Sequence, residues 1–321
     1  MSAMAGVAGA LRAVTARMVS AVGAYRPLEH AVGGARGGFV LAYHNLAAAR
    51  FAAQIAALAP SRPIALDELV ERHARGAPTR GLFAITFDDG VGETVREIAA
   101  AATAAQWPVT FYLPTGYLEA PGGMPFQWLR AIERQAPPVV IEAAGETFDF
   151  RPPGAIRAFA RATTEIMYTR PWTAYGPRLR ALADALVGRG LVAPETLAAP
   201  PAITWPEVEA LARAGVVSFE SHGITHTAVA ALTDDGLEHE LAESRRIIAE
   251  HTGRECRHFC YPYGGAASIG AVAPSRVARY YRSATTMTRG RLGRHALELL
   301  PRVPVYPHDD AALVRLKVLT A

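Results

Sequence analysis

The chain has 321 residues, of which 50% are hydrophobic and 19% charged, and this composition excludes general disorder. Its 33 Lys and Arg residues against 29 Asp and Glu residues give a net charge of +4, and the basic residues are scattered, which excludes a nucleic-acid-binding patch. No run of apolar residues is long enough for a transmembrane segment.

The N-terminal leader, residues 1–37, consists largely of small apolar residues interrupted by Arg12 and Arg17. No charged segment precedes its apolar stretch, so it is a poor secretory signal, although it could form an amphipathic helix. We therefore expect a cytoplasmic protein, either free or peripheral to the inner membrane. The catalytic unit is expected at residues 38–321, and the oligomeric state is not indicated.

Four short apolar runs each end in polar or turn residues, a pattern that predicts buried strands with functional groups at their carboxyl ends. They are Phe39–Tyr43 before His44, Leu82–Phe87 before Asp88, Val109–Leu113 before Pro114, and Val216–Phe219 before Glu220. A later strand is expected at His258–Tyr261.

Helical patterns lie between several of these strands. A capping box from Thr204 to Glu207 predicts a helix that runs to about Arg213. A second helix is predicted from about Asp234 to His251, and Gly253 lies where the cap at its C-terminal end is expected. Alternating strands and helices predict parallel strands, and a β/α barrel accommodates them with reactive groups at the strands' carboxyl ends.

Residues from about 119 to 200 break this alternation. Clusters of Pro and Gly occur at 121–123 and 152–154, and a helical stretch lies near 175–188. We interpret this segment as an insertion that shapes one wall of the cleft.

The segment Thr86-Phe87-Asp88-Asp89-Gly90 places two adjacent carboxylates at the end of a predicted strand. Asp-Asp pairs also occur at 234–235 and 309–310, where solvated helix starts would explain them. The pair at 88–89 follows a buried apolar strand, where carboxylates are costly unless they are paired with cations. Its position therefore favours a metal site.

The segment Ser221-His222-Gly223-Ile224-Thr225-His226 places two histidines four residues apart where a strand ends. On one helical turn this spacing brings both imidazoles to the same side. Two imidazoles and one carboxylate suit a divalent transition metal such as zinc, with positions left open for water and substrate. The neighbouring aspartate would then be free to take a proton from water.

A third segment, Phe259-Cys260-Tyr261-Pro262-Tyr263-Gly264-Gly265, ends a predicted strand in a turn. The backbone N–H groups of such a turn can stabilise an oxyanion, although an ordinary structural turn is the alternative. Cys256 and Cys260 are four residues apart around a predicted strand, where their side chains are too far separated to form a disulfide without bending the backbone. No second cysteine pair completes a zinc site, so both are expected to be free thiols.

Taken together and in this order, Thr-Phe-Asp-Asp-Gly, Ser-His-x3-His and Tyr-Pro-Tyr-Gly resemble the three leading motifs of the polysaccharide deacetylases of carbohydrate esterase family 4. That family includes chitooligosaccharide, peptidoglycan and poly-N-acetylglucosamine deacetylases. The resemblance covers about residues 38–306, including Tyr43-His44 and Leu300-Pro301-Arg302-Val303. It implies a distorted (β/α) barrel of the polysaccharide deacetylase type with a helical insertion.

The resemblance also implies roles for individual residues. Asp88 would be the general base, and Asp89, His222 and His226 would bind the metal. Zinc is the metal expected, with cobalt and nickel as alternatives.

The turn after the third motif would bind substrate through Pro262, Tyr263 and Gly264, with the Tyr263 backbone N–H joining the metal at the oxyanion. We expect His44 to be the general acid, because circularly permuted relatives that deacetylate poly-N-acetylglucosamine begin with a strand ending in Tyr-His. The alternatives are His308, from a late His-Asp pair, and a purely structural role for His44.

Two positions depart from the family pattern or lack an assigned role. Family members often have an arginine two residues before the proline of the third motif, where it holds the base. Here that position is Cys260, so the orientation of Asp88 is left open. Glu220 either supports His222 or packs at the barrel wall with an arginine.

The sequence thus predicts a metal-dependent hydrolase that removes N-acetyl groups from an amino-sugar-containing glycan or glycoconjugate. One alternative is hydrolysis of an O-acetyl ester, or of a cyclic amide or imide, at the same metal site. Another is a non-catalytic carbohydrate-binding relative, against which the intact motifs argue. The aromatic residues that could stack on sugar rings are Trp128, Trp172, Trp205 and Tyr263. The sequence does not indicate whether the acceptor is a polymer, a lipid-linked sugar or a small metabolite.

Overall fold

The computed structural model describes residues 37–119 and 123–321, so nearly all of the predicted leader lies outside the described residues. Within these ranges, seven parallel strands close into a barrel in the order β1-β10-β9-β8-β7-β4-β3, with β3 pairing back to β1. The strands are β1 (Phe39–Tyr43), β3 (Leu82–Phe87), β4 (Val109–Leu113), β7 (Val217–Ser221), β8 (His258–Cys260), β9 (Ser283–Arg289) and β10 (Leu300–Pro304). The predicted distorted (β/α) barrel is confirmed.

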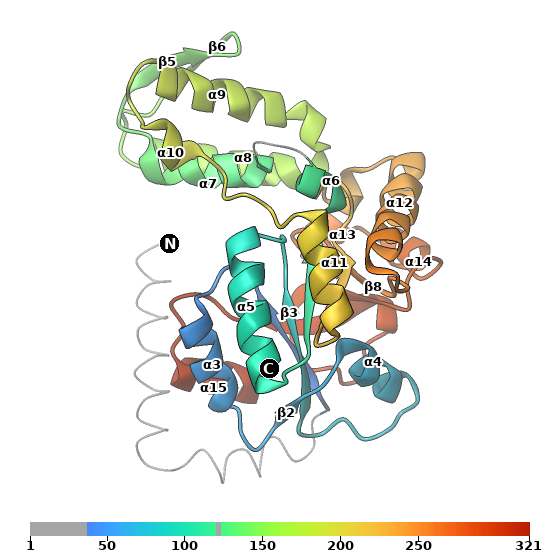
Figure 1. Ribbon diagram of the computed structural model, residues 1–321. Coiled ribbons are helices and arrows are strands. Elements are labelled where there is room, and N and C mark those ends of the chain that lie inside the picture. Colours follow the sequence, from blue (N-terminus) through green and yellow to red (C-terminus); the bar gives the residue numbers. More distant parts are fainter. Residues whose placement is uncertain (1–36, 120–122) are drawn as a thin grey trace.

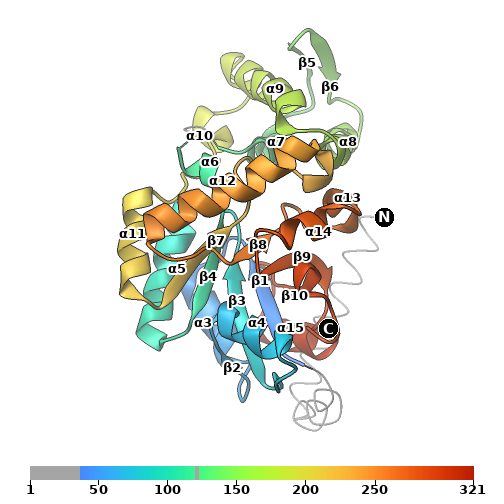
Figure 2. The same cartoon turned by 90° about the vertical axis from the view of Figure 1, so that its right-hand side faces the viewer.

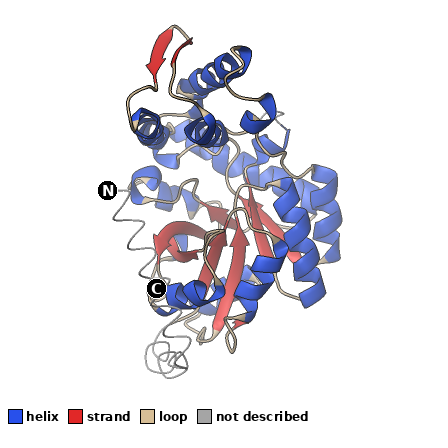
Figure 3. Ribbon diagram, turned by 90° about the vertical axis from the view of Figure 1, so that its left-hand side faces the viewer, coloured by secondary structure: helices blue, strands red, loops and turns tan. Residues whose placement is uncertain are grey.

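Helices surround this barrel, as Figures 1 and 3 show. The longer ones are α3 (Ala48–Ala56), α4 (Leu66–Ala74), α5 (Gly92–Ala105), α11 (Trp205–Ala214), α12 (Asp234–Thr252) and α15 (Ala311–Leu319). Short connecting elements are β2 (Arg62–Pro63), α6 (Thr115–Glu119), η2 (Val229–Ala231), α13 (Ala266–Ile269), α14 (Ala273–Val277) and η3 (Leu297–Leu299). Both helices predicted from capping signals are present.

A row of aromatic side chains joins four neighbouring strands on the outside of the barrel. The row consists of Tyr43, Phe87, Phe111 and Phe219, which are partners in register, with successive ring centroids 4.9, 5.6 and 5.7 Å apart. These rings pack in one cluster with apolar residues of the outer helices. Because side chains alternate along a strand, the residue after each outward ring faces the barrel axis, which directs His44 and Asp88 inwards.

The inside of the barrel is a packed core. It is filled by Val40, Ala84, Tyr112, Cys260 and Leu300, against which α4 packs Leu66, Leu69 and Val70. The barrel is therefore no channel, and a ligand can reach polar groups only at the ends of the strands.

The segment predicted as an insertion packs around a hydrophobic core of its own. It comprises α7 (Pro125–Gln135), the hairpin β5 (Val140–Ala143) and β6 (Glu146–Asp149), α8 (Ala155–Thr169), η1 (Trp172–Ala174), α9 (Gly176–Gly188) and α10 (Pro194–Leu197). Its core includes Ile132, Ile141, Phe148, Leu179 and Leu182. Figures 1 and 2 show it above the rest of the molecule.

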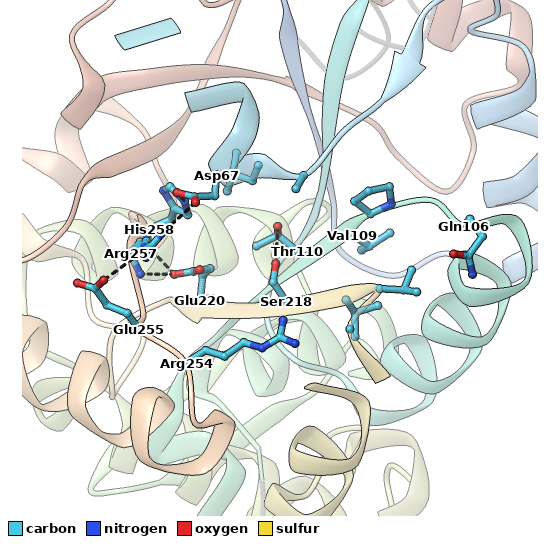
Figure 4. Close-up of a pocket in the computed structure, with 16 residues that line it drawn as sticks. Asp67, Gln106, Val109, Thr110, Ser218, Glu220, Arg254, Glu255, Arg257 and His258 are labelled. Atoms are coloured by element: carbon cyan, nitrogen blue, oxygen red, sulfur yellow. Dashed lines mark hydrogen bonds and ion pairs between the residues drawn. The ribbon is translucent and has the colours of Figure 1, made fainter. Parts of the chain in front are cut away.

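The seam between β7 and β8 differs from the other strand pairs. Among the described residues these strands pair at the single position Ser221 and Phe259. Glu220 bridges the rest of the seam, because its Oε2 accepts hydrogen bonds from the backbone N–H groups of Arg257 and His258, both at 2.7 Å (Figure 4). Glu220 thus belongs to the barrel wall and lines a second cavity of about 640 Å³ at the strands' amino ends, rather than supporting His222.

Two further expectations concern the cysteines and the membrane. Cys256 and Cys260 are free and buried, as predicted. None of the helices in the described part of the chain is long and apolar enough to cross a membrane.

We predict that Leu182→Ala, in the core of the insertion, loosens the insertion more than the barrel. The side chain is fully buried, and truncating a buried leucine to alanine costs about 2–5 kcal/mol. Hydrogen exchange should show faster exchange in α7, α8 and α9, with the barrel strands protected as before. In the control Leu241→Ala, at a buried position of α12, protection from hydrogen exchange should instead fall in the barrel. Equally faster exchange in the insertion and the barrel in both variants would contradict separate cores.

Candidate active site

Four strand ends meet at one cavity of about 540 Å³. His44 follows β1, Asp88 and Asp89 follow β3, His222 and His226 follow β7, and all five side chains line the cavity. The turn after β8 contributes Tyr263, and α7 and α8 of the insertion form the opposite wall. The structure therefore brings together the residues that the three motifs single out.

Asp88 is held by a buried arginine. Arg302 of β10 donates from Nη1 to Oδ1 at 2.7 Å and from Nη2 to Oδ2 at 2.8 Å. Burial by itself would raise the pKa of Asp88, but the charge and hydrogen bonds of Arg302 outweigh burial and hold this pKa well below its usual range. Asp88 is consequently ionised at neutral pH.

Arg302 supplies the cation that the third motif lacks. Its Nη2 lies 3.1 Å from the sulfur of Cys260, the residue at the position where an arginine is expected from the family pattern. Further donors of Arg302 reach Thr286 O at 2.9 Å and Thr86 Oγ1 at 3.1 Å. Sequence reasoning missed this role, although an arginine inside the apolar strand Leu300–Pro304 is itself a signal of a buried anion.

Asp89, His222 and His226 form the cluster best suited to a metal ion. Oδ1 of Asp89 lies 3.7 Å from Nε2 of His222 and 3.4 Å from Nε2 of His226. One ligand atom from each residue lies within 4.8 Å of the other two, and all three residues are buried.

The protonation of this cluster also suits a metal ion. Nδ1 of His222 lies 2.7 Å from the carbonyl oxygen of Cys260, so Nδ1 donates and Nε2 is left as the ligand atom. Burial lowers the pKa of His222 to about 4, so its ring is neutral near pH 7. Two imidazole nitrogens and one carboxylate oxygen fit a divalent transition metal.

A second possible ligand set, Asp88, His222 and Cys260, is less suitable. Both carboxylate oxygens of Asp88 already accept from Arg302, whose guanidinium also lies against the Cys260 sulfur. A cation in this position would be repelled by the guanidinium, and the thiol stays protonated because burial raises its pKa well above the usual value.

The two histidines lie on a non-helical turn, so the helical turn expected from their spacing is wrong. Gly223 and His226 have φ values of 78° and 56°, which turn the backbone sharply. Glu240 of α12 fixes this turn by accepting hydrogen bonds from the backbone N–H groups of Ile224 and Thr225. The turn, rather than helical periodicity, brings the imidazoles together.

Unusual backbone conformations concentrate at this site. Five residues other than glycine have a positive φ within the described ranges, and three of them are Asp89, His226 and Tyr263, with φ of 73°, 56° and 62°. Each belongs to a different motif. Such conformations cost about 1–3 kcal/mol each and persist where the surrounding structure imposes them, typically at functional sites.

His44 and His308 occupy different surroundings. His44 lines the cavity, and its Nε2 lies 3.8 Å from Oδ2 of Asp88. The side chain of His308 is 78% exposed and stacks on Tyr306 at the surface.

The expectation of a solvated Asp-Asp pair at 309–310 is half wrong. Asp310 caps α15 by accepting from the Leu313 N–H at 2.9 Å, as a helix start requires. Asp309 is instead fully buried beside Lys317, because that cation compensates its charge.

The tryptophans named as possible sugar platforms lie outside this cavity's lining. Trp205 is buried and stacks on His251 at 4.0 Å. Trp128 and Trp172 line a separate cavity of about 280 Å³ between the insertion and the turn at Ile224.

We predict that Arg302→Met destabilises the fold and that Asp88→Asn partly reverses the loss. Removing the arginine alone leaves a buried carboxylate without a partner, which costs about 3–5 kcal/mol, whereas the double variant removes the charge as well. Urea unfolding of the four proteins in the cycle measures the coupling. A double variant less stable than Arg302→Met would show that the ion pair does not govern this site.

Comparisons with known proteins bear on the fold and on the family of this chain. A search of curated proteins finds no match. The solved structures that resemble the chain include a Streptococcus pyogenes deacetylase, PplD, in complex with acetate, with 11% identity and a TM-score of 0.56 over 88% of this chain and 97% of that one. IcaB from Ammonifex degensii has 14% identity and a TM-score of 0.55 over 88% and 97%. BC0361, a polysaccharide deacetylase from Bacillus cereus, has 14% identity and a TM-score of 0.53 over 88% and 68%.

Structural likeness at this level of identity establishes the fold alone. The family follows from the sequence, because a family model described as polysaccharide deacetylase matches residues 75–273, more than half of the chain. This match contains the paired aspartates, the two histidines and the turn after β8. The chain therefore belongs to the polysaccharide deacetylase family.

Proposed function

We propose that this protein is a metal-dependent de-N-acetylase of an amino-sugar-containing glycan or glycoconjugate, with its catalytic unit at residues 38–321. The observation that carries the proposal is the adjacency of an ionised, arginine-held Asp88 to the buried cluster of Asp89, His222 and His226. A proton acceptor beside a metal-binding cluster, in a cavity that opens at the strand ends, suits hydrolysis of an amide.

Asp89, His222 and His226 would hold the metal, for which zinc fits the ligand set best and cobalt or nickel are alternatives. When bound, the metal would supply Lewis acidity for the acetamido carbonyl and for the attacking water. The remaining chemistry belongs to the side chains and backbone of the chain.

Asp88 is proposed to accept the proton of the attacking water. Arg302 fixes both oxygens of Asp88 and keeps it ionised, which is the form that a base requires. The backbone N–H of Tyr263, in the turn formed with Pro262 and Gly264, is proposed to donate to the oxyanion. The left-handed backbone at Tyr263 supports this role, because it makes the turn sharp.

His44 is proposed to protonate the departing amine. It lies beside Asp88 at the cavity and its side chain is 41% exposed, so it can meet both substrate and solvent protons. The acetyl-bearing sugar would enter between these barrel residues and the insertion. Acetate and the free amino sugar would be the products.

We predict zinc-dependent release of acetate from N-acetylglucosamine oligomers by the purified protein. Asp88→Asn should lower kcat by about 10²–10⁴ while the bound metal is retained, because a proton acceptor is lost and the ligands are not. His222→Ala should lose both the metal and the activity. Acetate assays and metal analysis measure these outcomes, and full activity of Asp88→Asn would exclude the proposed base.

The role of His44 has its own test in a matched pair of variants. His44→Ala should lower kcat by about 10²-fold or more with little change in KM, because an acid acts on the leaving amine rather than on binding. His308→Ala should retain activity, because that ring lies at the surface. Assays of kcat and KM with the same oligomer compare the pair, and the opposite result would assign the acid to His308.

A further inference from the structure

His222 and His226 are oriented in different ways. Nδ1 of His222 is fixed by a hydrogen bond to the carbonyl oxygen of Cys260. Nδ1 of His226 is buried and has no hydrogen-bond partner among the described residues. Metal-binding histidines almost always donate their second ring N–H to an acceptor that fixes the ring. On the side of its second ring nitrogen, His226 therefore lacks the hydrogen bond that fixes His222.

Aromatic rings surround the His226 imidazole. The ring of Phe126, on α7 of the insertion, lies with its centroid 4.9 Å from that of His226. Tyr263, from the turn after β8, lies at the same centroid distance and meets the imidazole edge-on at 80°. His222 completes the surroundings at 4.8 Å. The ring is thus clamped between the barrel and the insertion.

The insertion also contacts Tyr263, the aromatic residue that the barrel contributes next to His226. Tyr263 packs against the hydrophobic core of the insertion rather than against that of the barrel. Its ring meets that of Tyr168 of α8 edge-on, with the ring centroids 5.3 Å apart. Two aromatic residues of the insertion therefore reach His226, Phe126 directly and Tyr168 through Tyr263.

We propose that the insertion is a working part of the metal centre, with Phe126 as a positioning residue that holds the His226 imidazole in its ligating orientation. This inference rests on the ligand set of the proposed function. Glu240 fixes the backbone of the turn that carries His226, but no described residue forms a hydrogen bond with Nδ1 of the imidazole itself. Ring packing here replaces the hydrogen bond that orients His222.

The proposal carries a reciprocal consequence. If the insertion favours the ligating orientation of His226, a bound metal must favour the docked insertion by the same free energy. Metal should therefore protect α7 and α8 from hydrogen exchange, in addition to raising the Tm of the whole protein.

The test is metal affinity of the full-length protein, which does not depend on catalysis. Apo protein is titrated with Zn²⁺ against a chromophoric chelator, and with Co²⁺ while the visible spectrum of the bound ion is recorded. Phe126→Leu removes the ring and keeps an apolar side chain. It should weaken Zn²⁺ binding about 10-fold or more, as substitutions of groups that orient metal ligands do, and change the Co²⁺ spectrum. Phe126→Tyr retains the ring and should bind Zn²⁺ as the wild type does.

Phe159→Leu is the matched control within the insertion. Phe159 packs edge-on against Phe148 and Phe150 at 5.6 and 5.5 Å and does not line the active-site cavity. This variant should lose stability but keep its Zn²⁺ affinity within about twofold. The proposal would be overturned if Phe126→Leu bound Zn²⁺ as tightly as the wild type, or if Phe159→Leu lost as much Zn²⁺ affinity as Phe126→Leu. In either case, ring contact with His226 would be irrelevant to metal binding.

The outcomes separate this inference from the proposed function. The wild type could bind Zn²⁺ tightly, and Phe126→Leu could weaken this binding, while no oligomer releases acetate. That result would support the role of Phe126 and reject the proposed substrate class. Zinc-dependent acetate release with unchanged affinity in Phe126→Leu would support the function and reject the clamp.

Discussion

A carboxylate buried inside a barrel is costly unless a cation or hydrogen-bond donors compensate its charge, and Arg302 supplies both to Asp88. Asp88 directly follows β3 and Arg302 lies in β10, and these two strands are separated in the barrel by β1. Their side chains meet inside the barrel, next to the inner face of β1. The geometry of the proposed base therefore depends on closure of the barrel, since neither strand alone could fix it.

The site is assembled from two kinds of support. On the barrel side, hydrogen bonds define positions: Arg302 holds Asp88, a backbone carbonyl holds His222, and Glu240 holds the turn that follows. On the insertion side, support comes from packed rings around His226 and Tyr263. Hydrogen bonds thus set the geometry on the barrel side, and close packing of rings sets it on the insertion side.

Much of this arrangement could be predicted from the sequence, because the governing rule is local. Apolar runs that end in polar residues mark parallel strands, and the carboxyl ends of such strands meet at one end of a barrel. That rule placed His44, Asp88 and His222 together without knowledge of any long-range contact. Helix limits near Thr204 and Gly253 followed from capping chemistry in the same way.

What could not be predicted depends on contacts across the fold. Arg302 pairs with a residue 214 positions away, and nothing in its own neighbourhood identifies the partner. The turn holding His226 departs from a helix because Gly223 and Glu240 impose another backbone path, and Glu240 comes from a different element. Asp309 is buried because Lys317, on the helix that follows, compensates its charge. In each case a tertiary partner overrides a local pattern.

The seam between β7 and β8 has a consequence for how the gene can vary. A backbone ladder between strands survives every substitution except proline, because its donors and acceptors are the same for all other residues. Across this seam the side-chain carboxylate of Glu220, rather than a backbone carbonyl, accepts hydrogen bonds from the backbone N–H groups of Arg257 and His258. Beyond the pairing of Ser221 with Phe259, the contact between these two strands therefore depends on the identity of one side chain. A substitution of Glu220 would remove hydrogen bonds of a kind that side-chain substitutions leave intact at the other strand pairs.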